Sequence, residues 1–206
     1  MALSQPPQNA QCQHGNPEDL GAYLARMESP DRVEWQKPDE VIRALGGLRG
    51  KTVCDVGAGP GFLALPFAKA VGEAGTVYAV EVESRILEVL RDRIAQGGVR
   101  NIVPVLGLPD DPLLPANSCD LILMVNTFHH FQDGTGYLRR LAHALKEGGK
   151  LVNIDFHKKE TPVGPPLENR VSRDDLLEHA REAGYVLVGE PTALPHQYFL
   201  VLQRKR

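Results

Sequence analysis

The sequence is poor in the features that mark secreted and membrane-spanning proteins. It has 3 cysteines in 206 residues, and Cys12, Cys54 and Cys119 are too few and too scattered for a disulfide framework. No apolar run approaches the roughly 20 residues that a transmembrane helix needs, so we expect no membrane partner. The polar segment 1–15 lacks the apolar centre of a signal peptide, which favours a cytoplasmic location.

An excess of positive charge is also missing. The 23 Lys and Arg residues against 26 Asp and Glu residues give a net charge of -3, so electrostatics offers no case for a nucleic-acid partner. Hydrophobic residues at 42% and charged residues at 24% describe an ordinary globular chain. The length suits one α/β domain with a short extension.

What the sequence does contain is a glycine-rich turn after a short apolar strand. Asp55 lies near the end of that strand, and Gly57, Gly59 and Gly61 follow at alternate positions. Glycine lets the backbone turn sharply or approach a ligand closely. A helical pattern comes next, and a glycine turn between a strand and a helix is a place to hold a nucleotide. A dinucleotide-binding turn would need its third glycine at Phe62, so the spacing argues against that class.

After residue 50 the sequence alternates between strand and helix patterns. We expect strands at 52–56, 76–81, 101–106, 120–125 and 150–156, and helices at 62–71, 84–96 and 136–146. The pairs Gly97-Gly98 and Gly148-Gly149 are expected to end their helices. Such alternation predicts a parallel sheet with helices on both faces. Two late strands, 185–188 and 198–202, follow a helix that Ser172 caps, and they predict an antiparallel hairpin.

Three segments together resemble the class I S-adenosylmethionine-dependent methyltransferases. They are the acid-led glycine motif 55–61, the Asn-Thr-Phe-His-His-Phe stretch 126–131 after the fourth strand, and 145–151, which is similar to the family's Leu-Lys-Pro-Gly-Gly turn. The resemblance spans about residues 50 to 203. It implies a Rossmann-like, seven-stranded, mostly parallel sheet and S-adenosyl-L-methionine as cofactor. We expect 1–48 to form a helical extension or lid and 49–206 to form the methyltransferase domain.

The resemblance also implies which residues contact the cofactor. Glu81 ends the second strand about 20 residues after the glycines, where a carboxylate accepts hydrogen bonds from a ribose diol. Asn126 is expected to face the methionine part or the substrate. The full set of expected cofactor residues is Asp55, Gly57, Ala58, Gly59, Gly61, Glu81, Val82, Leu108, Asp110 and Asn126.

The adenine end departs from the family pattern. Leu108 stands where the family often has an acid, and Pro109 has no backbone N–H to offer the ring. We therefore expect Asp110 or Asp111 to replace the missing acid, with Leu108 in apolar contact with the adenine.

Candidate catalytic residues lie near the carboxyl ends of the fourth and fifth strands. They are His129, His130, Asp155 and His157. A base is needed only if the methyl acceptor arrives protonated, and histidine titrates near neutrality. Alternatively, one ring of the His129-His130 pair is a hydrogen-bonded anchor while the other lines the pocket. Adjacent side chains diverge, so we expect no metal site.

Candidate substrate contacts come from the N-terminal extension and from the segment after the fourth strand. Trp35 either packs over the pocket or anchors the extension to the domain, and Phe128 is expected to contact the substrate. A capped helix from Asn16 is expected to present Tyr23 on its apolar face. The proline-rich segment 158–167 would form another wall.

Together these features predict a methyltransferase that acts on a small-molecule acceptor, as a monomer or a homodimer. It is similar in outline to quinone C-methyltransferases and arsenite methyltransferases, although the cysteine set of the latter is missing. One alternative is a protein or nucleic-acid methyltransferase. The absence of an Asn-Pro-Pro-Tyr motif after the fourth strand disfavours methylation of the amino groups of nucleic-acid bases. Another is a non-catalytic module that binds the cofactor.

Overall fold

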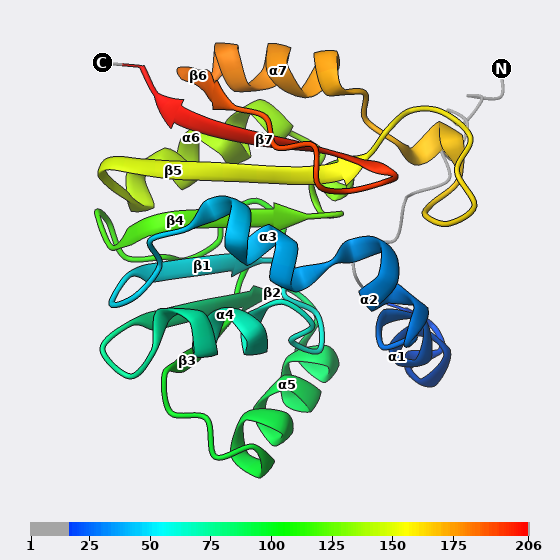
Figure 1. Ribbon diagram of the computed structural model, residues 1–206, viewed down its shortest axis with the longest axis vertical. Helices are drawn as coiled ribbons and strands as arrows, with labels where there is room; N and C mark the ends of the chain where they lie inside the picture. The colour runs from blue at the N-terminus through cyan, green and yellow to red at the C-terminus, as the bar shows by residue number, and fades with distance from the viewer. Residues whose placement is uncertain (1–16, 206) are drawn as a thin grey trace, which may run out of the picture.

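Residues 17–205 are described by a computed structural model, and seven strands within them form a single sheet in the order β3-β2-β1-β4-β5-β7-β6 (Figure 1). The strands are β1 (Thr52–Val56), β2 (Thr76–Glu81), β3 (Ile102–Leu106), β4 (Cys119–Val125), β5 (Leu145–Phe156), β6 (Tyr185–Gly189) and β7 (Gln197–Arg204). Of these, β7 runs antiparallel to both of its neighbours and the other pairs are parallel. The Rossmann-like α/β fold with its C-terminal hairpin is thus confirmed.

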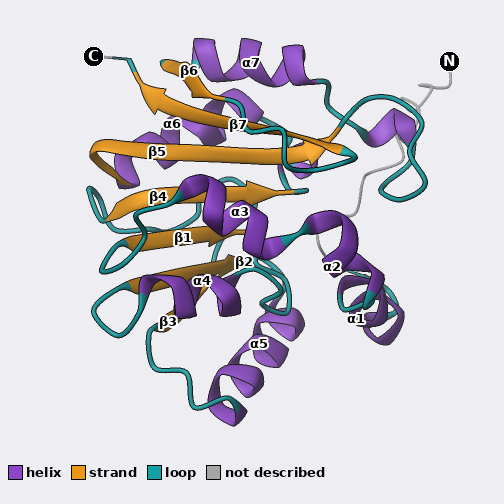
Figure 2. Cartoon of the chain, viewed as in Figure 1, coloured by secondary structure: helices purple, strands orange, loops and turns teal. Residues whose placement is uncertain are grey.

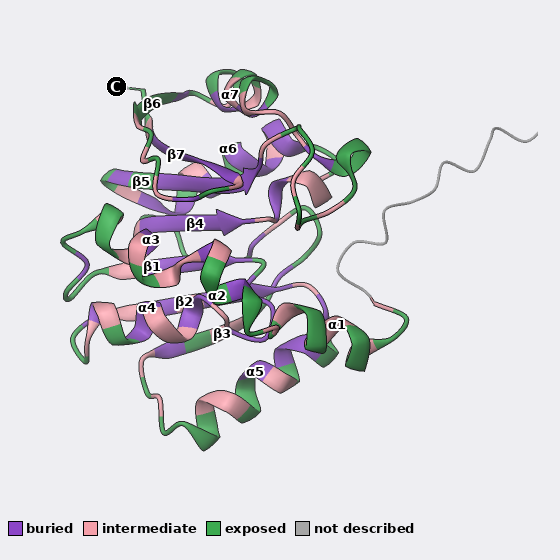
Figure 3. Ribbon diagram, turned by 45° about the vertical axis from the view of Figure 1, so that its right-hand side comes forward, coloured by how far each residue is buried: buried purple, intermediate pink, exposed green. Residues whose placement is uncertain are grey.

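Helices cover both faces of the sheet (Figure 2). They are α1 (Leu20–Met27), α2 (Asp31–Gln36), α3 (Pro38–Leu45), α4 (Ala64–Val71), α5 (Ser84–Gln96), α6 (Gly134–Ala144) and α7 (Arg173–Glu182). One hydrophobic core joins α3, α4 and α5 to the sheet, and a second core joins α6 and α7 to the opposite face. Burial is concentrated in the strands, while exposed residues lie on loops and outer helix faces (Figure 3).

Local sequence signals explain most element boundaries. The Ser172 hydroxyl accepts a hydrogen bond from Asp175 N at 3.1 Å, which caps α7 as expected. The helix expected at 136–146 is shifted, because the Asp133 side chain accepts from Gly136 N at 2.8 Å and starts α6 at Gly134. That helix ends at Ala144, and β5 already begins at Leu145. The expectation that Gly148-Gly149 would end the helix was therefore wrong.

The described part of the N-terminal extension, from residue 17 onward, contains three short helices. Asp19 caps α1 by accepting from Ala22 N at 2.9 Å, and the expected cap at Asn16 lies outside the described residues. Helices α1 and α2 lie beyond the carboxyl ends of the strands, whereas α3 runs along the face that carries α4 (Figure 1). Val41 of α3 is fully buried in the core shared with α4, so the extension is packed into the domain. The division at residue 48 stays a prediction.

The described part of the chain lacks both a membrane-spanning helix and a metal-binding cluster. Within residues 17–205, none of the helices combines the length and hydropathy needed to cross a bilayer. In the same part of the chain, no three His, Cys, Asp or Glu side chains gather as a metal ion would require.

Candidate functional site

The glycine turn is tied to both neighbouring strands. Backbone N–H groups of Gly57 and Ala58 donate to Val80 O at 2.9 and 3.0 Å. Gly57 has a φ of 76°, and a Cβ there would lie 2.5 Å from Thr127 Oγ1. Thr127 Oγ1 in turn lies 3.1 Å from Val56 O. Glycine at 57 therefore permits the ends of β1 and β4 to meet.

The other two glycines of the motif have different surroundings. A Cβ on Gly61 would lie 2.7 Å from Leu90 Cδ1, so this glycine lets α5 pack closely against the turn. A Cβ on Gly59 would meet nothing nearer than Tyr23 Oη at 3.9 Å. Gly59 itself is buried, whereas Gly57 is exposed, so a ligand would approach the turn at Gly57.

Glu81 is held in place by the backbone around it. Its Oε2 accepts from Gly59 N at 2.9 Å, and its Oε1 accepts from Val82 N at 2.8 Å and Glu83 N at 3.1 Å. Burial raises the pKa of this carboxyl above its ordinary value, and the three N–H groups oppose that rise. The carboxyl is thus fixed beside the glycine turn.

A cavity of about 560 Å³ extends from the turn across the carboxyl ends of the strands. This volume is typical of a small-ligand site. Its walls come from α1, the ends of β1 and β2, the loop after β3 and the region from β4 to α6. They include Tyr23, Gly57, Glu81, Val82, Pro109, Asp110, Thr127, His130, Phe131, Tyr137 and Arg140.

The loop after β3 corrects one expectation. Leu108 is 48% exposed and lies outside the cavity wall, which Pro109 and Asp110 form instead. The backbones of Leu108 and Asp111 bond to each other at 2.7 and 3.2 Å, and this tight turn brings Pro109 and Asp110 to the cavity. Arg140 Nη2 lies 3.4 Å from Asp110 Oδ2 and thereby joins α6 to the loop.

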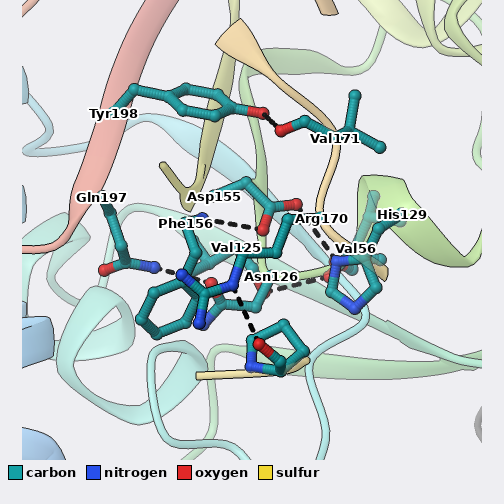
Figure 4. A network of polar contacts seen from close by, with 12 residues as sticks. Val56, Val125, Asn126, His129, Asp155, Phe156, Arg170, Val171, Gln197 and Tyr198 are labelled. Atoms are coloured by element: carbon teal, nitrogen blue, oxygen red, sulfur yellow. Dashed lines mark hydrogen bonds and ion pairs between the residues drawn. The ribbon is translucent and has the colours of Figure 1, made fainter. Parts of the chain in front are cut away.

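The two adjacent histidines point to different partners. His129 Nδ1 lies 3.2 Å from Asp155 Oδ2, and Asp155 is completely buried (Figure 4). Asp155 Oδ1 accepts from Phe156 N at 2.8 Å, which fixes the carboxylate. His130 lines the cavity, with its ring centre 4.1 Å from that of His129. This is the arrangement of one anchored ring and one ring on the pocket wall.

His157 and Phe128 lie apart from this pair. The ring of His157 packs against Tyr198 at 5.9 Å, and burial lowers its pKa. Phe128 is 3% exposed in the core under α6 and α7, where its ring lies 5.5 Å from that of His179. The short 3-10 turn Phe128–His130 directs this side chain inward. The expectation that Phe128 contacts the substrate was therefore wrong.

An aromatic and cationic stack supports the loop after β5. The Trp35 ring of α2 lies 5.4 Å from that of Phe156, and the Arg170 guanidinium lies 5.1 Å from the same Phe156 ring. Arg170 also donates to the loop, and its acceptors are His157 O, Lys159 O, Thr161 Oγ1, Val163 O and Pro165 O. The buried side chain of Arg170 thus holds the segment 158–167, which was expected to form a wall of the pocket.

Three side-chain amides form a closed ring at the carboxyl end of β4 and the amino end of β7. Gln36 Nε2 donates to Gln197 Oε1 at 2.9 Å, Gln197 Nε2 donates to Asn126 Oδ1 at 2.6 Å, and Asn126 Nδ2 donates to Gln36 Oε1 at 3.1 Å. Figure 4 shows the part of this ring between Gln197 and Asn126. Asn126 has a left-handed φ of 55°. The hydrogen bonds of its side-chain amide hold α2 against the sheet, and we call this ring of Gln36, Asn126 and Gln197 the latch. A contact between Asn126 and the cofactor stays a prediction.

Two buried charges lie behind the glycine turn. Asp55 is 2% exposed, and burial raises its pKa to about 7. Arg32 of α2 is 9% exposed, and burial lowers its pKa to about 10 while Asp55 attracts its charge. The guanidinium carbon of Arg32 lies 4.1 Å from the centre of the Phe62 ring.

Sequence reasoning gave no functional role to several of these side chains. Gln36 and Gln197 are separated by 161 residues and carry no motif. Arg32 and Arg140 are ordinary helical arginines in the sequence. For Arg32 and Gln36, the feature of the sequence that could have found them was the polar face of the short helix that also contains Trp35.

Known proteins resemble the chain over this region. Residues 53–149 match a family model described as a methyltransferase domain. Aklanonic acid methyltransferase DauC of Streptomyces sp. is 30% identical over 66% of this chain and 62% of its own length. The ubiquinone/menaquinone biosynthesis C-methyltransferase UbiE of Azotobacter vinelandii is 32% identical over 57% of this chain and 47% of its own length. The chain thus spans less than two thirds of either curated relative.

Structural similarity extends further along the chain. The crystal structure of a SAM dependent methyltransferase from Aquifex aeolicus superposes with a TM-score of 0.84 at 28% identity. The match covers 88% of this chain and 96% of that one. It therefore includes most of the elements that surround the cavity.

Proposed function

We propose that this protein, which matches a methyltransferase-domain family model over residues 53–149, transfers a methyl group from S-adenosyl-L-methionine to a small organic acceptor. The observation that carries the proposal is the meeting of two features at one edge of the sheet. One is the glycine turn, which lines the cavity at Gly57 beside the fixed Glu81 carboxyl, and the other is the His129–Asp155 pair behind the cavity-lining His130.

The residues present fit the cofactor. Gly57, which is exposed, lines the cavity together with Glu81 and Tyr23. Pro109 and Asp110 form the wall where we place the adenine. When bound, the sulfonium methyl group is already activated toward direct displacement, so the chain has to orient the acceptor, exclude water and accept a proton.

His129 is our candidate for the proton acceptor. Asp155 fixes the orientation of the imidazole through Nδ1, which leaves Nε2 to take a proton from an acceptor hydroxyl or acidic C–H. Because Asp155 is fully buried and anchored by Phe156 N, the imidazolium that forms gains a nearby negative charge. The bound cofactor would supply the methyl group, and the His129–Asp155 pair would hold the proton that the acceptor loses.

The relatives suggest the class of acceptor. The names of the two curated relatives refer to aklanonic acid and to ubiquinone and menaquinone biosynthesis. We therefore propose an aromatic or quinone-like acceptor that carries an ionisable hydroxyl or enol. The cytoplasmic location and the oligomeric state stay predictions.

The proposal is tested by methyl transfer from S-adenosyl-L-methionine with a tritiated methyl group to a panel of phenols, hydroxyquinones and enolic carbonyl compounds. We expect one acceptor class to be labelled, and His129→Gln or Asp155→Asn to lower kcat by roughly 10²- to 10⁴-fold. The cofactor dissociation constant should not change in either variant. The exposed His143 of α6 supplies the control His143→Gln, which should keep the wild-type rate.

Two results would redirect the proposal. Labelling of proteins or nucleic acids in place of small molecules would favour the macromolecular alternative. Cofactor binding without labelling of any acceptor would favour a binding module that does not catalyse transfer.

A further inference from the structure

A second hollow lies at the end of the sheet opposite the cavity. Strand β7 runs antiparallel to β5, so its last residues reach the end of the sheet where the parallel strands begin (Figure 1). There the C-terminal ends of α6 and α7 and the end of β7 surround a hollow of about 460 Å³. Among the described residues, none lines both this hollow and the cavity at the glycine turn. The proposed methyl transfer therefore gives this hollow no role.

Three cationic side chains border the hollow. Arg139 comes from α6, and Arg204 and Lys205 come from the end of β7. In the described part of the chain, no Asp or Glu lines the hollow, and none of the three cations forms an ion pair. The whole chain has a net charge of -3, so this is a local concentration of positive charge on an acidic protein. Such a concave positive surface attracts anions.

Both arginines are held at the ends of helices. Arg139 Nη2 donates to Glu182 O at 3.2 Å, and Arg204 Nη1 donates to Ala142 O at 3.3 Å. These carbonyls belong to the last turns of α7 and α6, where backbone acceptors have no partner within the helix. A guanidinium has five N–H donors, and each of these bonds uses only one of them. The bonds thus fix two guanidinium groups beside the hollow and leave donors available for a ligand.

The arrangement indicates the charge and the size of the ligand. A guanidinium binds phosphate oxygens through paired N–H groups, and a lysine ammonium adds a compact point charge. Several cations around one small hollow suit a small ion with more than one negative charge. A long polyanion such as RNA is less suitable, because it would extend beyond the hollow over a protein whose net charge is negative.

We propose that this hollow binds a small anion that carries phosphate groups, through Arg139, Arg204 and Lys205. The site lies at the far end of the sheet from the glycine turn, and the proposal does not depend on the proposed methyl transfer. It gives the protein a second ligand, which binds independently of the groups that line the cavity.

The test is isothermal titration calorimetry of the full chain with inorganic pyrophosphate at low ionic strength. We expect saturable binding to the wild type that weakens as salt is added. Lys205→Met should weaken binding by roughly 2- to 5-fold, because an exposed charge pair contributes up to about 1 kcal/mol. The double variant Arg139→Met, Arg204→Met should weaken it by roughly 10-fold or more, since two such pairs are lost.

A control on a neighbouring helix separates this site from general charge effects. Arg181 of α7 is exposed, lies 3.7 Å from Glu178 and does not line the hollow, so Arg181→Met should bind pyrophosphate as the wild type does. The backbone N–H of Lys205, which Lys205→Met keeps, donates to Gly184 O at 2.8 Å. That variant therefore keeps the test decisive if the arginine variant does not fold.

Three results would overturn the proposal. The first is the absence of saturable pyrophosphate binding to the wild type. The second is an affinity that Lys205→Met leaves unchanged, or that Arg181→Met lowers as much as Lys205→Met does. The third is binding of a single-stranded RNA oligonucleotide by a wild type that does not bind pyrophosphate, which would make this end of the protein a nucleic-acid surface instead.

Discussion

The side-chain amide of Asn126 donates a 3.1 Å hydrogen bond to Gln36 Oε1, although 90 residues separate the two in the chain. Gln197 closes the ring, and each amide donates one bond and accepts one. Gln36 is completely buried and Gln197 is 3% exposed, so water cannot easily replace a lost partner. This contact joins the N-terminal extension to the ends of β4 and β7.

Replacing Gln36 by leucine should therefore destabilise the protein. The change leaves Asn126 Nδ2 and Gln197 Oε1 without their partners, and a buried unsatisfied group costs roughly 1 to 3 kcal/mol. Urea unfolding of the wild type and Gln36→Leu measures the difference. Val33 on the same helix is 54% exposed, so Val33→Ala should stay within about 0.5 kcal/mol of the wild type. A Gln36→Leu variant as stable as the wild type would show that the ring contributes nothing.

A second prediction concerns the stability cost of adding a Cβ to Gly57 of the glycine turn. Gly47, which lies outside the turn, serves as the reference that separates the cost of backbone strain from the cost of a steric clash. Gly47 and Gly57 both have positive φ, but a Cβ on Gly47 meets nothing within 4 Å. Gly47→Ala should cost about 1 kcal/mol from backbone strain alone. Gly57→Ala should cost about 1 to 3 kcal/mol more, because its Cβ would lie 2.5 Å from Thr127 Oγ1.

Adding Thr127→Ala to Gly57→Ala isolates the steric contribution. The two changes should partly compensate, so that the double variant is more stable than the sum of the single variants predicts. Unfolding free energies of the four proteins give this coupling directly. Strictly additive effects would mean that the turn relaxes away from β4 and that the close contact is not required.

The buried Asp55 predicts a specific dependence of stability on pH. Its pKa is about 7 in the folded protein against an ordinary value of 3.8, so the folded state holds the proton more strongly than the unfolded state. The contribution of Asp55 to the unfolding free energy should thus fall as pH rises from about 4 to about 7. Asp55→Asn removes this dependence, and the variant should gain as much as about 4 kcal/mol relative to the wild type across that window.

Urea midpoints measured at intervals over this pH range test the prediction. The exposed Asp39 of α3 supplies the control Asp39→Asn, whose stability should follow that of the wild type throughout. Parallel curves for Asp55→Asn and the wild type would mean that Asp55 titrates as an ordinary carboxyl and that Arg32 neutralises it fully.

Arg170 should control the order of the loop after β5. Its guanidinium binds Lys159 O at 2.7 Å and Pro165 O at 2.8 Å, and it stacks on Phe156. Arg170→Met would leave these carbonyls without a donor, so backbone amides of 158–167 should exchange hydrogen faster in mass spectrometry. Arg173, which pairs with Glu190 on the surface at 2.6 Å, provides the control Arg173→Met. Unchanged exchange in the Arg170 variant would exclude it as the organiser of this loop.

The fold was predictable because its signals are local. Apolar strands, glycine stops and caps such as Ser172 alternate along the chain in the order that a parallel sheet requires. The errors fell where local and nonlocal forces compete. At Gly148 the strand β5 takes over a segment whose glycines are typical of a helix end, because Leu145 pairs with Cys119 of β4.

The site was predictable only where residues form motifs. The glycines, Glu81 and the two histidines stand at fixed distances from strand ends, which gave their places from sequence. The latch was not predictable, since Gln36 and Gln197 meet only after the whole sheet has formed. Phe128 was misassigned because a one-residue difference within a short 3-10 turn decides whether a ring faces the core or the cavity.

Calorimetric titration of S-adenosyl-L-methionine into the wild-type protein and into Gly59→Val tests the central claim most directly. Gly59 N donates to Glu81 Oε2 at 2.9 Å, and a Cβ on Gly59 would have Tyr23 Oη as its nearest neighbour at 3.9 Å. We predict saturable binding to the wild type and a large loss of affinity in Gly59→Val, with both proteins folded. No binding to the wild type at millimolar cofactor, or equal affinity in the two proteins, would contradict the assignment of this site.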